Sequence, residues 1–419
     1  MKTVRGVPCL TNGFFGRMDV DFIESFGDDV APALLKREDR ISVISFDPAG
    51  KFLAVGDHGG RIIIFSIDDN PKTGPKFSFV CQIEAHISEF DYLRSVFSSK
   101  TVNSIKWVPT TVLNPLFLSC NSSQVKLWRL DYTKEFSWEN SSGNSFDTFI
   151  PPIPSIKHER YFPTHVKSFN DYSGDFNVEI CCLEDQKSFL SIGENNVSLW
   201  DFELSKPVTI VRSTPDPNQS VAYTTASVHR SLPFSFLVGD SLGNVKLYDL
   251  RQQPEDISPS ISISLSTFST EATVSGTQPI SSIIFSRDAR TFTVRTFGDL
   301  QMWDFRNMNA PIATANVQWY PTQMDWIISE GFINDKFDMA MMPDGSIITG
   351  KYSCDFVSWN PINKTKCTHR AQSAKAKKPT DTRLDFNKKV TAVGAHPTNG
   401  VFAVAPNSSL FIFKGKTHQ

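Results

Sequence analysis

A strand pattern that occurs seven times along the 419-residue chain limits most strongly how this sequence can fold. Each copy contains a β-rich run, a turn, a second run, a tight turn and a strand that ends in an aromatic residue. The copies span residues 41–65, 102–128, 179–200, 223–248, 280–303, 336–359 and 390–413. Their alternation of apolar and other residues is typical of strands packed between neighbouring sheets. Seven matched copies favour one repeating fold over a set of unrelated β-sandwich hairpins.

The third strand of each copy reads apolar, any residue, apolar, aromatic. It ends at Phe65, Trp128, Trp200, Tyr248, Trp303, Trp359 or Phe413. Asp follows the aromatic residue in Trp200-Asp201, Tyr248-Asp249 and Trp303-Asp304, which is the dipeptide of WD-repeat blades. The sequence therefore predicts an all-β protein, a single-domain, seven-bladed WD-repeat β-propeller over residues 1–419.

The two ends of the chain predict how the ring closes. The last copy stops at Phe413, after three strands of a four-stranded blade, and would leave an open sheet edge. The β-prone segment 12–24 (NGFFGRMDVDFIE) belongs to no other copy. Placed as the outer strand of blade seven, it closes the ring and covers that edge. Deletion of the first 25 or so residues should then cause cooperative loss of the fold.

Three stretches between the copies are predicted to be long loops, about 133–165, 251–278 and 366–384. The first two are rich in Ser, Asn and Pro, and the third is basic and poor in apolar residues. The basic stretch is interpreted as a solvated inter-blade loop, with a nuclear-import or acidic-partner patch as the alternative.

Four stretches connect this chain with a known family. They are GDHGGRIIIF (56–65), EFDYLRS (89–95), EGFINDKFD (330–338) and DFNKKVTAVGAHP (385–397). Together they closely resemble the B-type (55-kilodalton, WD-repeat) regulatory subunits of protein phosphatase 2A, in order and over nearly the whole chain. EFDYL and DFNKK are not general features of WD repeats.

The resemblance implies a function and a set of partners. In that family the propeller bridges a HEAT-repeat scaffold subunit and the serine/threonine phosphatase catalytic subunit, and it selects phosphoprotein substrates. A hairpin arm from blade two, placed here at about 78–105, is implied to bind the scaffold. The scaffold-binding residues carried over are Glu89, Phe90, Asp91, Tyr92, Leu93 and Arg94. Without the family, packing of these aromatic side chains on the propeller's own flank is the simpler interpretation.

The resemblance also implies a substrate groove on the top face, where this sequence departs from the family. Asp57, His58 and Glu194 are the groove candidates, although turn-stabilising roles are equally open for them. The family's Asp-Lys-Gly-Gly turn is Asp57-His58-Gly-Gly here, so an imidazole replaces a fixed cation. A pair of family acids is reduced to Glu194, and a family glutamate aligns with Arg37. We expect a divergent member with a retained scaffold role and a different substrate set.

Other classes of function find no support in the sequence. HExxH, G-x-S-x-G and P-loop patterns do not occur, so we expect no enzyme activity. The seven cysteines lack CxxC spacing, and we expect no metal site and no cofactor. A net charge of −2 predicts no bulk attraction to nucleic acid or to a membrane. No apolar run is long enough for a transmembrane helix or signal peptide, which predicts a cytoplasmic or nuclear protein. The competing hypothesis is a WD-repeat platform in a chromatin or ubiquitin-ligase assembly.

Overall fold

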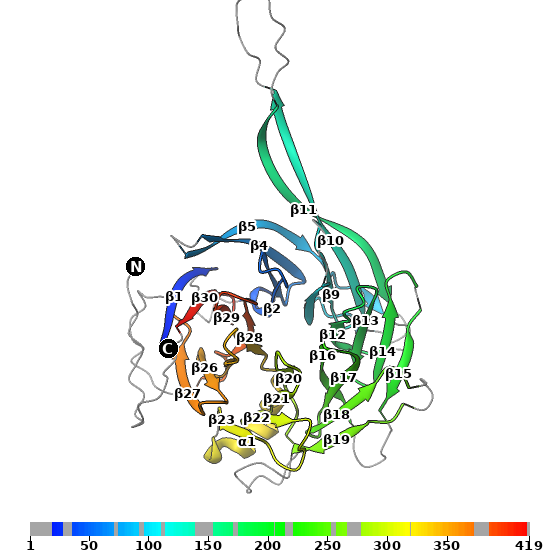
Figure 1. Ribbon diagram of the computed structural model, residues 1–419, viewed down its shortest axis with the longest axis vertical. Helices are drawn as coiled ribbons and strands as arrows, with labels where there is room; N and C mark the ends of the chain where they lie inside the picture. Colours follow the sequence, from blue (N-terminus) through cyan, green and yellow to red (C-terminus); the bar gives the residue numbers. More distant parts are fainter. Residues whose placement is uncertain are drawn as a thin grey trace, which may run out of the picture.

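Seven four-stranded antiparallel sheets are arranged as the blades of a ring in the computed structural model (Figure 1). The structure describes residues 19–27, 36–70, 74–91, 96–109, 114–138, 154–170, 175–204, 206–213, 221–252, 257–265, 278–318, 320–372 and 385–416. The predicted seven-bladed β-propeller is confirmed. Each of the seven sequence copies supplies three consecutive strands of one blade.

The first four blades follow the chain without crossovers. Blade one contains β2 (Ile41–Phe46), β3 (Phe52–Asp57), β4 (Arg61–Asn70) and β5 (Gly74–Glu84). Blade two contains β8 (Ser104–Trp107), β9 (Leu116–Cys120), β10 (Gln124–Trp138) and β11 (Pro154–Asn170). Blade three contains β12 (Asn177–Cys182), β13 (Ser188–Gly193), β14 (Asn196–Asp201) and β15 (Val208–Arg212). Blade four contains β16 (Tyr223–His229), β17 (Leu232–Asp240), β18 (Asn244–Asp249) and β19 (Ile261–Ser264).

The last three blades include the closing sheet. Blade five contains β20 (Ser282–Phe285), β21 (Thr291–Arg295), β22 (Asp299–Asp304) and β23 (Ala313–Asn316). Blade six contains β24 (Met339–Met341), β25 (Ile347–Gly350), β26 (Asp355–Asn360) and β27 (Thr365–Arg370). Blade seven contains β28 (Val390–Ala395), β29 (Val401–Pro406), β30 (Leu410–Lys416) and β1 (Asp19–Phe26).

The N-terminal strand closes the ring, as predicted. β1 pairs antiparallel with β30, from Asp19 opposite Lys416 to Phe26 opposite Leu410. Aromatic side chains support this pairing, since the rings of Phe22 and Phe413 lie 5.8 Å apart. The described strand begins at Asp19 rather than near residue 12, and residues 12–18 lie outside the described part of the chain.

The core lies between neighbouring blades and contains the aromatic anchors of the repeat. Trp200 and Trp303 are fully buried, as β-propeller strands with two covered faces require. In blade two the indole nitrogen of Trp128 donates to Ser119 Oγ at 3.0 Å, and Ser119 Oγ lies 2.9 Å from Nε2 of buried His86. Trp128 is therefore both a core residue and a hydrogen-bonding partner that fixes one strand to the next.

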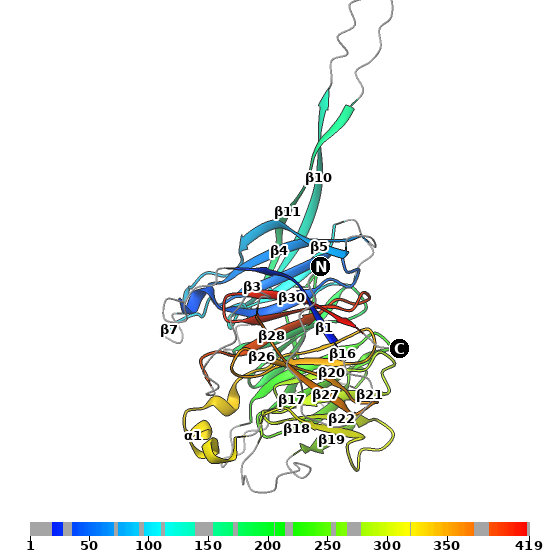
Figure 2. The same cartoon turned by 90° about the vertical axis from the view of Figure 1, so that its left-hand side faces the viewer.

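The projecting hairpin of blade two lies at a different position from the predicted arm. β10 and β11 pair continuously from Gln124 opposite Asn170 to Trp138 opposite Pro154, and they extend outward from the ring (Figures 1 and 2). The predicted arm at 78–105 instead contains the end of β5, the two-residue strands β6 (Phe90–Asp91) and β7 (Val96–Phe97), and the start of β8. The arm forms at β10 and β11 because their pairing continues to Trp138, whereas β9 pairs with β10 only as far as Arg129.

Three predicted loops contain strands. β10 and β11 occupy both sides of the loop predicted at 133–165, and residues 139–153 lie outside the described part. β19 lies within 251–278 and β27 overlaps the start of 366–384, because each blade needs a fourth, outer strand. Such strands have one exposed face and a polar sequence, which resembles that of a loop.

A single short α-helix occurs among the described residues. α1 (Met324–Ser329) connects blades five and six, flanked by the 3₁₀ turns η4 (Pro321–Gln323) and η5 (Phe332–Asn334). Figure 2 shows α1 and β7 on the same side of the ring. No helix in the described part is long and apolar enough to cross a membrane.

The tight turn of blade one gives a testable packing constraint. Gly60 has φ of +86°, and a Cβ atom there would lie 2.0 Å from the carbonyl oxygen of His86. Gly345 has φ of +82° and no atom within 4 Å of such a Cβ. We expect Gly60→Ala to lower the free energy of unfolding by at least about 2 kcal/mol more than Gly345→Ala, because only Gly60 meets backbone. Equal effects in urea unfolding would contradict this packing.

Candidate functional site

Asp57 holds the β3–β4 turn of blade one. Its Oδ1 accepts the backbone N–H of Arg61 at 2.9 Å, and its Oδ2 accepts Arg61 Nε at 2.6 Å. The residue is buried. These contacts are those of a turn-stabilising residue, the second of the two roles expected for Asp57.

His58 lies at the mouth of the ring's central channel. It lines a cavity of about 580 Å³ together with residues that precede the inner strands of blades one, two, six and seven. Its Nδ1 lies 3.3 Å from Thr101 Oγ1. Burial, and then the positive charges of Arg37 and Arg40, lower the pKa of His58 below its ordinary value. The imidazole is therefore held neutral at pH 7 in a surrounding that is rich in cations.

Glu194 lies exposed on the matching turn of blade three. Its backbone N–H donates to Phe176 O at 3.1 Å, and its carbonyl accepts from Tyr223 N at 2.8 Å. It lines a second cavity of about 200 Å³, which shares the residues Val178, Asp335 and Lys336 with the cavity at His58. The structure thus brings His58 and Glu194 to adjoining hollows on one face, whereas Asp57 lines neither.

The cavity at His58 also contains charged residues that the sequence analysis did not assign to the site. Lys389 Nζ lies 2.6 Å from Asp335 Oδ1, and the hydroxyl of Tyr352 donates to Asp335 Oδ2 at 2.7 Å. Lys336 reaches down the channel to Glu179 at 3.3 Å. Asp335 and Lys336 belong to EGFINDKFD, and Lys389 belongs to DFNKK. These two family-like stretches could therefore have pointed to the site, because Asp335 of one forms an ion pair with Lys389 of the other.

A buried carboxylate organises the channel below this mouth. Glu179 on β12 accepts from Lys106 Nζ at 3.1 Å, from Thr225 Oγ1 at 2.8 Å and from Lys336 Nζ at 3.3 Å. Burial alone would raise the pKa of Glu179, but the two ammonium groups and the hydroxyl lower it to about 2. The carboxylate stays ionised and links side chains from blades two, four and six.

At Asp338, unlike at Glu179, the effect of burial on the pKa outweighs that of the nearby positive charges. Burial raises its pKa to about 6, and the nearby Lys336 offsets only part of that rise. Because this folded-state pKa exceeds the ordinary value of 3.8, folded stability falls as pH rises from 3.8 to about 6, above which Asp338 is ionised in both states.

We expect Asp338→Asn to raise the free energy of unfolding by about 2 kcal/mol at pH 7.5 and by much less at pH 4.5. Urea unfolding at both pH values measures this, with the exposed Asp68→Asn as the control that should change little. A stabilisation that is equal at both pH values would contradict the assignment.

β7, which follows the segment predicted to bind a scaffold, lies on the same side of the ring as α1 (Figure 2). Glu89 is exposed, and Phe90 is paired with Phe97 across the small β6–β7 hairpin, with ring centroids 5.1 Å apart. Phe97 is 71% exposed, so this aromatic pair faces solvent. Asp91 is described only as a strand residue, and Tyr92, Leu93 and Arg94 lie outside the described part of the chain.

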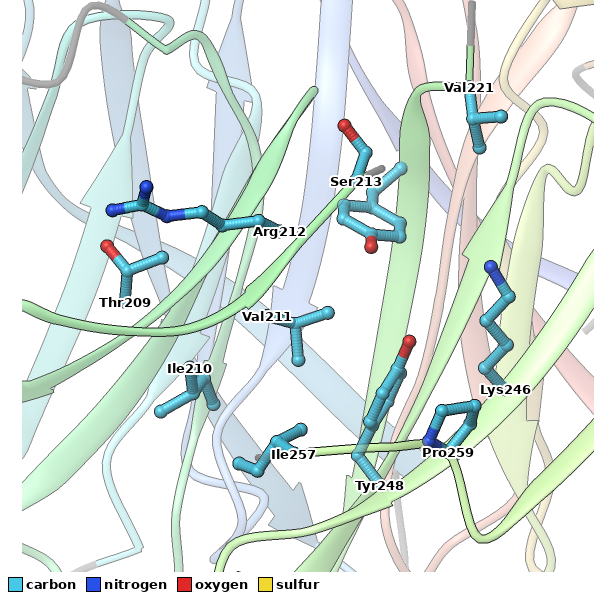
Figure 3. A pocket seen from close by; sticks show the side chains of 11 residues that line it. Thr209, Ile210, Val211, Arg212, Ser213, Val221, Lys246, Tyr248, Ile257 and Pro259 are labelled. Atoms are coloured by element: carbon cyan, nitrogen blue, oxygen red, sulfur yellow. The ribbon is translucent and has the colours of Figure 1, made fainter. Parts of the chain in front are cut away.

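A larger cavity of about 720 Å³ lies at the rim between β15 and β18 (Figure 3). Its wall includes Val211, Tyr248 and Lys246, and Lys246 Nζ lies 3.6 Å from Asp240. None of the residues predicted for the groove or for scaffold binding lines it. The rim cavity is thus separate from the channel mouth.

Comparison with known proteins finds a relative that covers most of the chain. No protein-family model matches the chain. The B-type regulatory subunit of protein phosphatase PP2A from Candida tropicalis is 28% identical over 395 residues, which cover 86% of this chain and 76% of that protein. A phosphatase regulatory subunit with a β-propeller fold is a non-catalytic kind of protein, in agreement with the expectation of no enzyme activity. The chain is thus similar to a B-type regulatory subunit of protein phosphatase 2A along most of its length.

Proposed function

We propose that this protein docks on a HEAT-repeat scaffold through the β10–β11 hairpin and recruits phosphoproteins to a serine/threonine phosphatase catalytic subunit. The similarity to a phosphatase regulatory subunit along 86% of the chain carries this proposal. The channel mouth at His58 and Glu194 is the face that we assign to substrates.

The base of the hairpin supports its assignment as a docking arm. Tyr161 on β11 packs against Tyr132 on β10 at 4.9 Å and against Phe52 of blade one at 5.0 Å between ring centroids. These contacts anchor the arm where it leaves the propeller. An arm with a fixed base loses less conformational entropy on binding than a free loop does.

Shortening the arm tests the docking role. Because Thr133 pairs with Arg160, replacing residues 134–159 by Asn-Gly should close a two-residue hairpin and keep the Tyr132–Tyr161 contact. We expect this variant to keep the thermal midpoint of the propeller within a few degrees and to lose at least about tenfold in affinity for a purified HEAT-repeat scaffold. Calorimetry and a pull-down assay measure the two effects.

The segment 89–94 remains a second candidate for the same contact. Phe90→Ala with Tyr92→Ala should weaken scaffold binding if that segment docks as the family resemblance implies. If only the arm variant loses scaffold binding, docking is assigned to β10–β11. If only the variant of Phe90 and Tyr92 loses scaffold binding, docking is assigned to the segment 89–94. Undiminished scaffold binding by both variants would contradict both assignments.

The alternative of a WD-repeat platform in a chromatin or ubiquitin-ligase assembly predicts different partners. Affinity purification from native lysate followed by mass spectrometry distinguishes the two. We expect a HEAT-repeat scaffold and a phosphatase catalytic chain in the purified complex. Recovery of a cullin adaptor or of histones in their place would overturn the proposed function.

A further inference from the structure

The channel mouth has more positive than negative charge among the side chains that line it. Four cationic residues line the cavity at His58, namely Arg37, Arg40, Lys336 and Lys389, and two carboxylates, Asp335 and Asp338, line it with them. The partners of these groups decide which charges are available to a ligand.

The two lysines are already neutralised. Lys389 pairs with Asp335 at 2.6 Å. Lys336 and Lys106 lie against Glu179 and the nearby Asp338, so that two cations meet two carboxylates. This part of the cavity therefore offers little net charge to a ligand.

The two arginines differ from the lysines. In the described part of the chain, no carboxylate forms an ion pair with Arg37 or Arg40, while the neighbouring Asp39 and Asp57 both bind Arg61, at 2.7 and 2.6 Å. Nε of Arg40 is buried and has no hydrogen-bond partner among the described residues. Among the described residues, these two guanidinium groups at the cavity wall thus have no counter-charge.

His58 faces the same charges. Arg37 and Arg40 come from the segment before β2, Lys389 from the segment before β28, and Asp57 is its neighbour in the chain; Thr101 Oγ1 lies 3.3 Å away. The cations together with burial hold the imidazole neutral, with only Asp57 acting in the other direction. An anion in the cavity would remove part of this repulsion and give His58 a hydrogen-bond acceptor.

We propose that Arg37, Arg40 and His58 form a site for the phosphate group of a phosphorylated serine or threonine on a protein substrate. The charge of such a phosphate, about −1.5 to −2 at pH 7, matches two unpaired guanidinium groups better than the single charge of a carboxylate does. Guanidinium groups bind phosphate oxygens with two parallel hydrogen bonds. The inference rests on the proposed function, since it specifies what the substrate-facing mouth recognises.

Fluorescence anisotropy with the full-length chain tests the site. The probes are a labelled peptide with one phosphothreonine flanked by Gly and Ala, the same peptide with threonine, and the same peptide with glutamate. We expect the phosphopeptide to bind at least about tenfold more tightly than either of the others. Inorganic phosphate at millimolar concentration should compete with it, because both present the same group.

Arginine variants test where the phosphopeptide binds. Arg37→Gln with Arg40→Gln should lower phosphopeptide affinity about tenfold or more and abolish the preference over threonine. Arg306→Gln, at an exposed arginine after β22 that does not line the cavity, should leave both unchanged. Arg37→Gln alone, at an exposed position, keeps the test valid if the double variant unfolds; it should lower affinity at least threefold. Equal binding of the three peptides, or an unchanged preference in the arginine variants, would overturn the proposal.

A scaffold pull-down with the same variants separates this proposal from the proposed function. Arg37→Gln with Arg40→Gln should bind the HEAT-repeat scaffold like the unaltered chain, because the arm lies on the rim (Figure 1). Scaffold binding without a phosphopeptide preference would refute the phosphate site alone. A phosphopeptide preference without scaffold binding would refute the proposed assembly and leave the site standing.

Discussion

Removal of residues 1–27 is expected to unfold the whole propeller rather than one blade. The deletion removes β1 and exposes the edge of β30 along its full length. It also removes Phe22, Ile23 and Phe26, which pack against the apolar clusters on both sides of blade seven. Full burial of an apolar side chain contributes about 1.5–3 kcal/mol, and these three side chains are half-buried, so their loss removes a large part of the stability of about 5–15 kcal/mol that is usual for a folded protein.

Circular dichroism, thermal unfolding and limited proteolysis of the truncated chain measure this effect. We expect loss of the cooperative transition and aggregation at 37 °C, and partial recovery of the transition when a peptide of residues 19–27 is added but not with a scrambled peptide. Ile362→Ala, at a side chain 77% exposed on blade six, is the control and should change stability little. A truncated chain that remains monomeric with an unchanged thermal midpoint would show that β1 does not close the ring.

The sequence predicted the blades because their inner strands obey a local rule. Strands such as β3 and β13 are buried along their whole length, so their residues must be apolar or small, and an aromatic anchor such as Trp200 follows at a fixed distance. The outer strands follow no such rule. β27 alternates half-buried and exposed residues, and its sequence TKCTHR could equally be that of a loop.

The predicted position of the arm differs from that of the projecting hairpin for a related reason. A projecting hairpin such as β10–β11 is held by its own pairing rather than by a core, so its sequence need not follow the pattern that the blades repeat. The segment around Phe90 is distinctive in sequence, but its described strands β6 and β7 have two residues each. Aromatic residues alone do not indicate how far a hairpin extends.

The site was only partly predictable because its pairs join distant parts of the chain. The turn residues Asp57, His58 and Glu194 could be found one at a time from their positions in the repeat. The pairing of Lys389 with Asp335 could not, since 54 residues and a blade boundary separate them. Charge at the channel mouth depends on which side chains neutralise each other, and only the folded ring determines that.

The largest electrostatic effect on stability is expected at Glu179. Its carboxylate is 12% exposed and contacts Lys106 and Lys336, whose side chains keep 39% and 34% exposure to the channel. Replacing Glu179 by Gln leaves two ammonium groups facing each other in a confined space. Breaking a buried pair in this way costs about 3–5 kcal/mol, and partial solvation of the lysines reduces the expected loss to about 3 kcal/mol.

This loss should depend on pH in a defined direction. The pKa of Glu179 is lowered from 4.5 to about 2, so its stabilisation is fully present above pH 4.5 and is lost as pH falls toward 2. Urea unfolding of Glu179→Gln and of the unaltered chain should therefore show a gap at pH 7.5 that narrows below pH 4.5. Glu38→Gln, which breaks the exposed pair with Lys100 at 3.9 Å, is the control and should cost less than about 0.5 kcal/mol.

A double-mutant cycle decides whether the effect comes from the pair itself. Lys336→Gln in the Glu179→Gln background removes one of the two cations that repel each other, so it should cost less than Lys336→Gln alone, with a coupling energy of at least about 1 kcal/mol. Additive losses would mean that Glu179 stabilises the ring by packing alone. A coupling of the expected size would instead show that the ionised carboxylate of Glu179 holds Lys336 by charge. The carboxylate would thereby fix Lys336 at the mouth where, among the described residues, Arg37 and Arg40 form no ion pair.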